Sequence, residues 1–172
     1  DCFGMVAVVD WGADEVRLTE RVSVLVGADA GRYPAGNSLV VRGDGEAVII
    51  DPSVTVVQRG GATLPIDAVI CSHRHEDHLA GNGLFADARV HIHHDDLPGA
   101  RSLDGLMDVY GLTAEIREAF AAQIVEEFHY TPRPDAQGFG DGHRWDLGGV
   151  GLDAVHLPGH TRTGQPTGWR LG

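Results

Sequence analysis

The stretch Ile66-Asp67-Ala68-Val69-Ile70-Cys71-Ser72-His73-Arg74-His75-Glu76-Asp77-His78 is an apolar run followed by a polar loop. The apolar run predicts a buried strand, and the loop begins where that strand would emerge. Three imidazoles and two carboxylates lie within the last six residues. Zinc and other borderline divalent metals prefer these ligand types. So dense a cluster on one short turn indicates a metal site rather than packing.

The spacing of these side chains supports one metal ion and suggests a second. Alternate side chains of an extended segment point the same way, so His73 and His75 can converge on one ion. Asp77 and His78 lie where the chain is free to turn into a helix, and they could face another ion. Two ions about 3.5–4 Å apart would clamp the attacking and leaving oxygens of a hydrolysis.

Three segments resemble motifs of one known family. His73–His78 resembles the HxHxDH signature of the metallo-β-lactamase-fold hydrolases. His156–Thr161 is similar to the PGHT element of the same family, and Gly36–Val41 with Ala47–Pro52 is similar to its early pair of strands. The matches follow the family's order over residues 21–161. The alternative is a chance His-rich loop on an unrelated fold.

The resemblance implies an α/β fold of the α+β type, the αββα sandwich, in which two facing sheets lie under outer helices. It implies a single domain over residues 1–172. The expected activity is that of a metal-dependent hydrolase, in which metal-activated hydroxide attacks a small ester, thioester, lactone or β-lactam. The expected cofactor is Zn²⁺, two ions in a complete site, with iron or manganese as alternatives.

The resemblance also assigns the site residues. It implies that the first metal ion is held by His73, His75 and His160, and that Asp77 and His78 contribute to the second. Asp77 would also be catalytic, because it would orient the nucleophile. The resemblance gives Asp51 a supporting role, in which its hydrogen bonds hold the metal loop. A turn-starting Asp before proline is the alternative for this residue. The sequence identifies no substrate-binding residue.

The chain departs from the family after His160. The family would next supply a strand, an Asp that bridges both metals, further strands and a last His, and none of these is present in residues 161–172. This tail has no apolar alternation, so we expect no strand there and a fold that is incomplete on its C-terminal side. A shortened domain, an out-of-frame tail and a natural short homologue that pairs with another chain remain open. The rival function is therefore a non-catalytic or partner-dependent metal-binding fragment.

Composition limits the partners. The formal net charge is −12, and all 13 basic residues are Arg. Such a chain disfavours nucleic acid and anionic membrane surfaces, which need clustered cations, and favours a small-molecule substrate. A homo-oligomer stays open. Without Lys, recognition of a substrate carboxylate by a cationic side chain would have to use Arg.

Cysteine usage and the N-terminal sequence bear on the compartment. The two cysteines, Cys2 and Cys71, make no disulfide framework, and Cys71 is expected to be a small buried hydrophobe rather than a ligand. We expect no leader peptide, and no apolar stretch of the sequence is long enough to span a bilayer. A cytoplasmic location is the default expectation. Because the sequence starts with Asp1 rather than Met, the natural N-terminus stays open.

Hydrophobic patterning predicts strands in the first half and helices later. Strands are expected at residues 5–9, 21–26, 39–42, 47–50, 66–71 and 89–93, with a hairpin over 145–155. Helical spacing covers residues 102–129, with a break at Gly111 and an N-cap at Thr113. Residues 131–134 and 138–142 are expected to be loops.

The remaining histidines are not assigned as ligands. His91, His93 and His94 are expected to be structural or solvated, and His156 to pack at a strand end. His129 and His143 are substrate-side candidates. Arg74 and Glu76 occupy the variable positions of the motif, and we expect them to face solvent or substrate.

Overall fold

The computed structural model describes residues 15–61, 65–157, 160 and 167–172, and for residues 167–171 it describes the backbone only. The predicted strand at residues 5–9, Cys2, and Pro158, Gly159 and Thr161 of the PGHT element lie outside the described residues.

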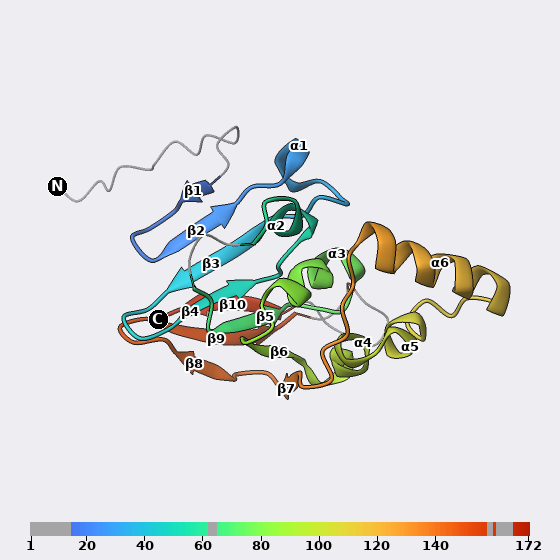
Figure 1. Ribbon diagram of the computed structural model, residues 1–172. Coiled ribbons are helices and arrows are strands. Elements are labelled where there is room, and N and C mark those ends of the chain that lie inside the picture. The colour runs from blue at the N-terminus through green and yellow to red at the C-terminus, as the bar shows by residue number, and fades with distance from the viewer. Residues whose placement is uncertain (1–14, 62–64, 158–159, 161–166) are drawn as a thin grey trace.

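Seven strands form the first sheet, in the order β1-β2-β3-β4-β5-β6-β7 (Figure 1). The strands are β1 (Glu15–Arg17), β2 (Val22–Leu25), β3 (Ser38–Arg42), β4 (Ala47–Ile50), β5 (Ala68–Cys71), β6 (Arg89–His93) and β7 (Gln137–Phe139). Neighbours from β1 to β4 are antiparallel, and those from β4 to β7 are parallel. The predicted strands at residues 21–26, 39–42, 47–50, 66–71 and 89–93 are confirmed.

The first sheet is buried on both faces, which explains why its central strands are apolar without alternation. Ile49 and Val69 face the core shared with the helices. Ile50 and Ile70 face the second core, which also holds Trp145. Cys71 is fully buried, as predicted, and packs in the helical core.

Helices cover one face of this sheet (Figure 1). They are α1 (Ala28–Gly31), α2 (Val54–Gln58), α3 (Glu76–Leu79), α4 (Leu97–Arg101), α5 (Leu103–Met107) and α6 (Ala114–Glu127), with 3-10 turns η1 (Ala80–Leu84) and η2 (His94–Asp96). The predicted break between two helices is confirmed, and Thr113 is the residue before α6. No helix among the described residues is long and apolar enough to cross a bilayer.

A second sheet packs on the opposite face, with strands β8 (Arg144–Asp146), β9 (Gly151–His156) and β10 (Thr167–Leu171) in the antiparallel order β10-β9-β8. The predicted hairpin over 145–155 is β8 and β9. The expectation of no strand after residue 160 is wrong, because β10 pairs with β9 from Thr167↔His156 to Leu171↔Leu152. Strand pairing uses backbone N–H and C=O groups, and every residue except proline has both, so a strand can form without an apolar alternation. The helices, the first sheet and the second sheet are therefore three successive layers of the predicted sandwich.

The turns of the two sheets meet at Gly43. A Cβ on Gly43 would lie 1.7 Å from the carbonyl oxygen of Leu147, so only glycine fits there. The amides of Asp44 and Gly45 donate to the carbonyls of Gly148 and Leu147 at 2.7 and 3.0 Å. The turn between β3 and β4 therefore also joins the first sheet to the β8–β9 connection.

The prediction of a loop at residues 138–142 is wrong for its first two residues. Gly138 and Phe139 belong to β7, which pairs in parallel with β6. A Cβ on Gly138 would lie 2.3 Å from Nδ1 of His94. A side chain at this position would displace the His94 ring, so glycine here accommodates the close approach of that ring, and its turn propensity is overridden by the strand pairing.

Candidate metal centre

The loop that follows β5 carries the candidate site. β5 ends at Cys71, and the chain emerges at the carboxyl end of the parallel strands before turning into α3 at Glu76. In open α/β sheets this edge is the usual place for a ligand site. The fully buried strand therefore fixes the base of a loop whose side chains reach into a pocket.

Three predicted ligands converge. His73 and His75 lie on this loop, and His160 lies beyond the end of β9, so the two sheets both contribute. One nitrogen or other donor atom from each lies within 4.8 Å of the others, and Nε2 of His73 is 3.1 Å from Nδ1 of His75. The three rings meet edge-on, with centroids 4.8 to 5.0 Å apart. Within the described part of the chain, this is the only such group of His, Cys, Asp or Glu.

The chemistry of this donor set fits a divalent cation. Burial, and next the charge on His78, lower the pKa of His73 to about 3, and burial also lowers the pKa of His75. Both imidazoles are therefore neutral at pH 7, which is the form that binds a metal. Three protein ligands with an open fourth position are typical of catalytic zinc sites.

Asp77 and His78 lie beside this group but do not complete a second one. Nε2 of His78 lies 3.6 Å from Oδ2 of Asp77, and Nδ1 lies 3.0 Å from Oδ2 of Asp51. Burial alone would lower the pKa of His78, but the nearby carboxylates, Asp51 first, outweigh it and raise this pKa to about 9. Burial also raises the pKa of Asp77. His78 therefore has to lose a proton before it can bind a metal.

Asp51 connects β4 to the metal loop. Its backbone lies in the left-handed region at φ 51°, an uncommon conformation for a residue other than glycine. Its Oδ1 accepts a hydrogen bond from the amide of Ser72 and its Oδ2 one from the Ser72 hydroxyl, both at 2.6 Å. Burial would raise the pKa of Asp51, but His78 and these hydrogen bonds lower it.

Ser72 extends this connection to a metal-ligand candidate. Its Oγ lies 2.9 Å from Nδ1 of His73, so Asp51, Ser72 and His73 form a chain of polar contacts. Sequence reasoning gave Ser72 no role. Its position between the strand and the first His of the motif could have indicated a residue that supports the metal site.

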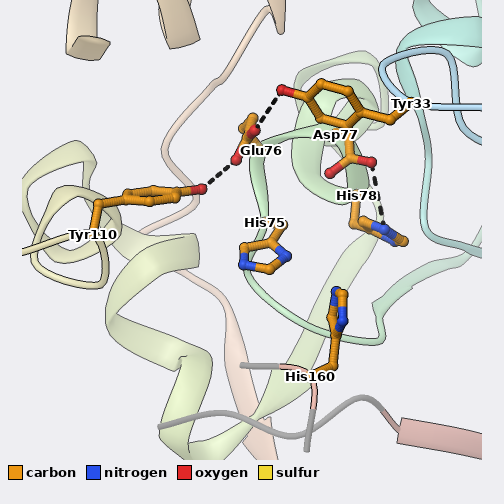
Figure 2. A pocket seen from close by; sticks show the side chains of 7 residues that line it. All are labelled: Tyr33, His75, Glu76, Asp77, His78, Tyr110 and His160. Carbon is orange, nitrogen blue, oxygen red and sulfur yellow. Dashed lines mark hydrogen bonds and ion pairs between the residues drawn. The ribbon is translucent and has the colours of Figure 1, made fainter. Parts of the chain in front are cut away.

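The site opens into a pocket of about 420 Å³ (Figure 2). The pocket is lined by Tyr33, His75, Glu76, Asp77, His78, Tyr110 and His160. The sequence gave no indication of Tyr33 or Tyr110, because each lies far along the chain from the motif.

Of the two variable positions of the motif, both expected to face solvent or substrate, only Arg74 differs from the expectation. Arg74 is 6% exposed, and its Nε lies 3.1 Å from Oδ1 of the fully buried Asp96. Glu76 is also 6% exposed, but it lines the pocket. Its carboxylate accepts hydrogen bonds from the hydroxyls of Tyr33 and Tyr110 (Figure 2). Arg74 is therefore a buried ion-pair partner, and Glu76 belongs to the pocket wall.

The other histidines lie away from this pocket. His91 is buried on β6, with its ring 5.7 Å from that of Trp145, and His143 packs on the same indole at 4.4 Å. His156 ends β9 with its ring 5.4 Å from that of His93. His129 lines a separate hollow beside Leu84. The structural expectation for His91 is confirmed, whereas His129 and His143 do not line the candidate site.

Comparisons with known proteins agree with this geometry. The sequence model described as the metallo-beta-lactamase superfamily matches residues 31–165. No curated protein matches the sequence.

Solved structures share the fold. FEZ-1 metallo-beta-lactamase from Legionella gormanii has a TM-score of 0.62 at 21% identity, with 90% of this chain and 56% of that chain covered. BJP-1, a subclass B3 metallo-beta-lactamase of Bradyrhizobium japonicum, has a TM-score of 0.61 at 15% identity, covering 92% and 56%. ST1585, a superfamily protein of the archaeon Sulfolobus tokodaii, has a TM-score of 0.60 at 15% identity, covering 89% and 60%. The chain thus spans little more than half the length of these similar proteins.

Proposed function

Because this chain belongs to the metallo-beta-lactamase superfamily, we propose that it carries the metal-binding half of the active site of a zinc-dependent hydrolase. The substrate class is a small ester, thioester, lactone or β-lactam. The observation that carries the proposal is the convergence of His73, His75 and His160, of which His75 and His160 line a pocket.

In this proposal the three histidines hold the cation. A bound divalent ion would supply hydroxide near neutral pH and polarise the scissile group. Ser72 and Asp51 keep His73 oriented, since the Ser72 hydroxyl contacts both Asp51 and Nδ1 of His73. A hydrogen bond to the second ring nitrogen fixes the tautomer that binds metal.

Asp77 is proposed as the catalytic carboxylate, next to the histidines in the pocket wall. Its carboxylate would orient the attacking water and accept its proton. His78 would stay paired with Asp51 when one ion is bound, and would contribute to a second ion only after losing its proton. Binding of a second ion therefore requires further ligands beyond those among the described residues.

This last point supports a second candidate, a metal-binding fragment that needs a partner or further sequence for catalysis. Among the described residues Asp77 and His78 find no third donor. Turnover by the zinc-loaded chain separates the two candidates. The hydrolase proposal expects at least one tightly held zinc and turnover of simple esters, whereas the fragment binds one zinc without turnover.

The test uses His75→Ala and Asp77→Ala, with His94→Ala as the matched control. His94 is an exposed histidine on η2, outside the pocket. We expect His75→Ala to lose both zinc and hydrolysis, and Asp77→Ala to lose hydrolysis while it retains one zinc. His94→Ala should match the unaltered protein. Hydrolysis that survives both site substitutions would exclude the proposed roles.

A further inference from the structure

Glu76 presents an acidic and aromatic wall to the pocket. Tyr33, from the loop after α1, donates to Oε1 at 3.1 Å, and Tyr110, from the segment after α5, donates to Oε2 (Figure 2). A carboxylate has about four lone-pair positions, and these two bonds use two of them. Glu76 is 6% exposed and lines the pocket, so its carboxylate forms part of the pocket wall.

Aromatic rings flank this carboxylate. The Tyr110 ring is stacked 6.3 Å from that of His75, and it is held edge-on at 5.0 Å by Phe120. The Tyr33 ring lies 5.9 Å from that of Phe128. Rings held in this way beside a carboxylate attract ammonium ions, because the ring face carries negative electrostatic potential.

The charge around the pocket points the same way. Glu76 and Asp77 both line it, and none of its described lining residues is an arginine. The cationic side chain that does line it, His78, is paired with Asp51 and Asp77. Arg32, the neighbour of Tyr33, is exposed and paired with Asp29 at 3.0 Å. The chain has no lysine and a net charge of −12, so its field also favours cations. A carboxylate-bearing substrate would therefore meet two acids at this wall.

We propose that Glu76, with the rings of Tyr33 and Tyr110, selects substrates that carry an ammonium group close to the bond that is cleaved. This inference rests on the proposed hydrolase function and names the substrate class of the same site. For a thioester of this class, water adds to the acyl carbon, the carbon–sulfur bond breaks, and the products are a carboxylic acid and a thiol.

The test compares two thioesters of equal shape, acetylthiocholine and S-(3,3-dimethylbutyl) thioacetate, which differ by a quaternary nitrogen in place of a carbon. Thiol release by the zinc-loaded chain gives kcat/KM for each. We expect a preference of roughly tenfold for the cationic thioester, from one ion pair and the ring faces. Glu76→Gln should abolish the preference, and Glu118→Gln, the same charge change on the exposed side of α6, should retain it. An equal ratio in the unaltered protein and Glu76→Gln overturns the inference.

A binding measurement separates this inference from the hydrolase proposal. Tetramethylammonium titrated into the zinc-loaded chain should shift the tyrosine ring resonances, and neutral tert-butanol should not. If neither thioester is cleaved, thioesters are excluded from the proposed substrate class, and tetramethylammonium alone decides the inference. Saturable binding that Tyr110→Leu weakens supports the ammonium site, and shifts no larger than those of tert-butanol refute it.

Discussion

Replacing Asp51 with Asn tests whether the polar chain behind the metal loop sets the affinity of the site. Asn has nearly the shape of Asp and tolerates a positive φ, so the backbone at φ 51° can persist. Its amide offers one oxygen to three donors, the amide and hydroxyl of Ser72 and Nδ1 of His78. At least one charge-assisted contact is lost.

The expected size follows from those contacts. Hydrogen bonds to a charged group contribute about 1.5–3 kcal/mol each, so the zinc-free Asp51→Asn protein should lose about 2–3 kcal/mol of unfolding free energy. Loss of a residue that orients a metal ligand weakens metal binding about 10–100-fold. Asp51→Ala should lose at least about 3 kcal/mol, because the partly buried His78 and the two Ser72 donors lose their shared carboxylate and Ala disfavours the left-handed backbone.

Urea unfolding of the zinc-free proteins gives the stability, and competition with a chromophoric chelator gives the zinc affinity. Asp67→Asn is the matched control. Asp67 also accepts a hydrogen bond from a backbone amide, that of Ala47 at 2.8 Å, but it is exposed and precedes β5 instead of following β4. Its zinc affinity should equal that of the unaltered chain. If Asp51→Asn binds zinc within about twofold of the unaltered protein, Asp51 does not orient the site, and the expected 10-fold minimum is refuted.

Two further predictions concern stability away from the site. Burial lowers the pKa of His91 to about 4. Between about pH 6.5 and 4 the unfolded chain therefore binds a proton that the folded chain does not. As the pH decreases through that window, the free energy of unfolding decreases by up to about 3 kcal/mol. His91→Phe keeps a ring against Trp145, and its urea midpoints should fall less from pH 7 to pH 4.5; parallel profiles would contradict this. Arg133 donates to the carbonyls of Asn82, Phe85 and Ala88 at 3.2, 3.0 and 2.8 Å, so Arg133→Met should destabilise by about 3 kcal/mol in chemical denaturation. Arg144→Met, which removes an exposed pair with Asp153, should change stability by less than about 1 kcal/mol, and equal losses in the two variants would argue against the buried role.

The sequence predicts the elements whose signals are local. β5 is an uninterrupted apolar run because both of its faces are covered, and the histidines follow directly where it ends. α6 and the residue after it show four-residue apolar steps, of which Ile124 and Phe128 are buried, although Ile116 is 56% exposed. Spacing reports a helix, but only tertiary packing decides how far along that helix the core extends.

What the sequence could not show depends on contacts between distant segments. Tyr33 and Tyr110 reach Glu76 only after the helices have packed, and neither has a local pattern that marks a pocket. β10 lacks alternation, yet it pairs with β9 through main-chain hydrogen bonds. The variable position of Arg74 in the motif predicts that it faces solvent or substrate, but the fully buried Asp96 provides a partner inside the fold.

The candidate ligands come from both layers of strands. His73 and His75 follow β5 of the first sheet, and His160 lies beyond β9 of the second. A cation held by all three would cross-link the sheets at one edge, while the contact between Gly43 and Leu147 joins their turns elsewhere. Since a ligand that binds only the folded state stabilises every part that must be in place to bind it, removing the cation would loosen the docking of one sheet on the other and not the loop alone. The two layers would thus unfold as one cooperative unit when loaded and could separate earlier when stripped.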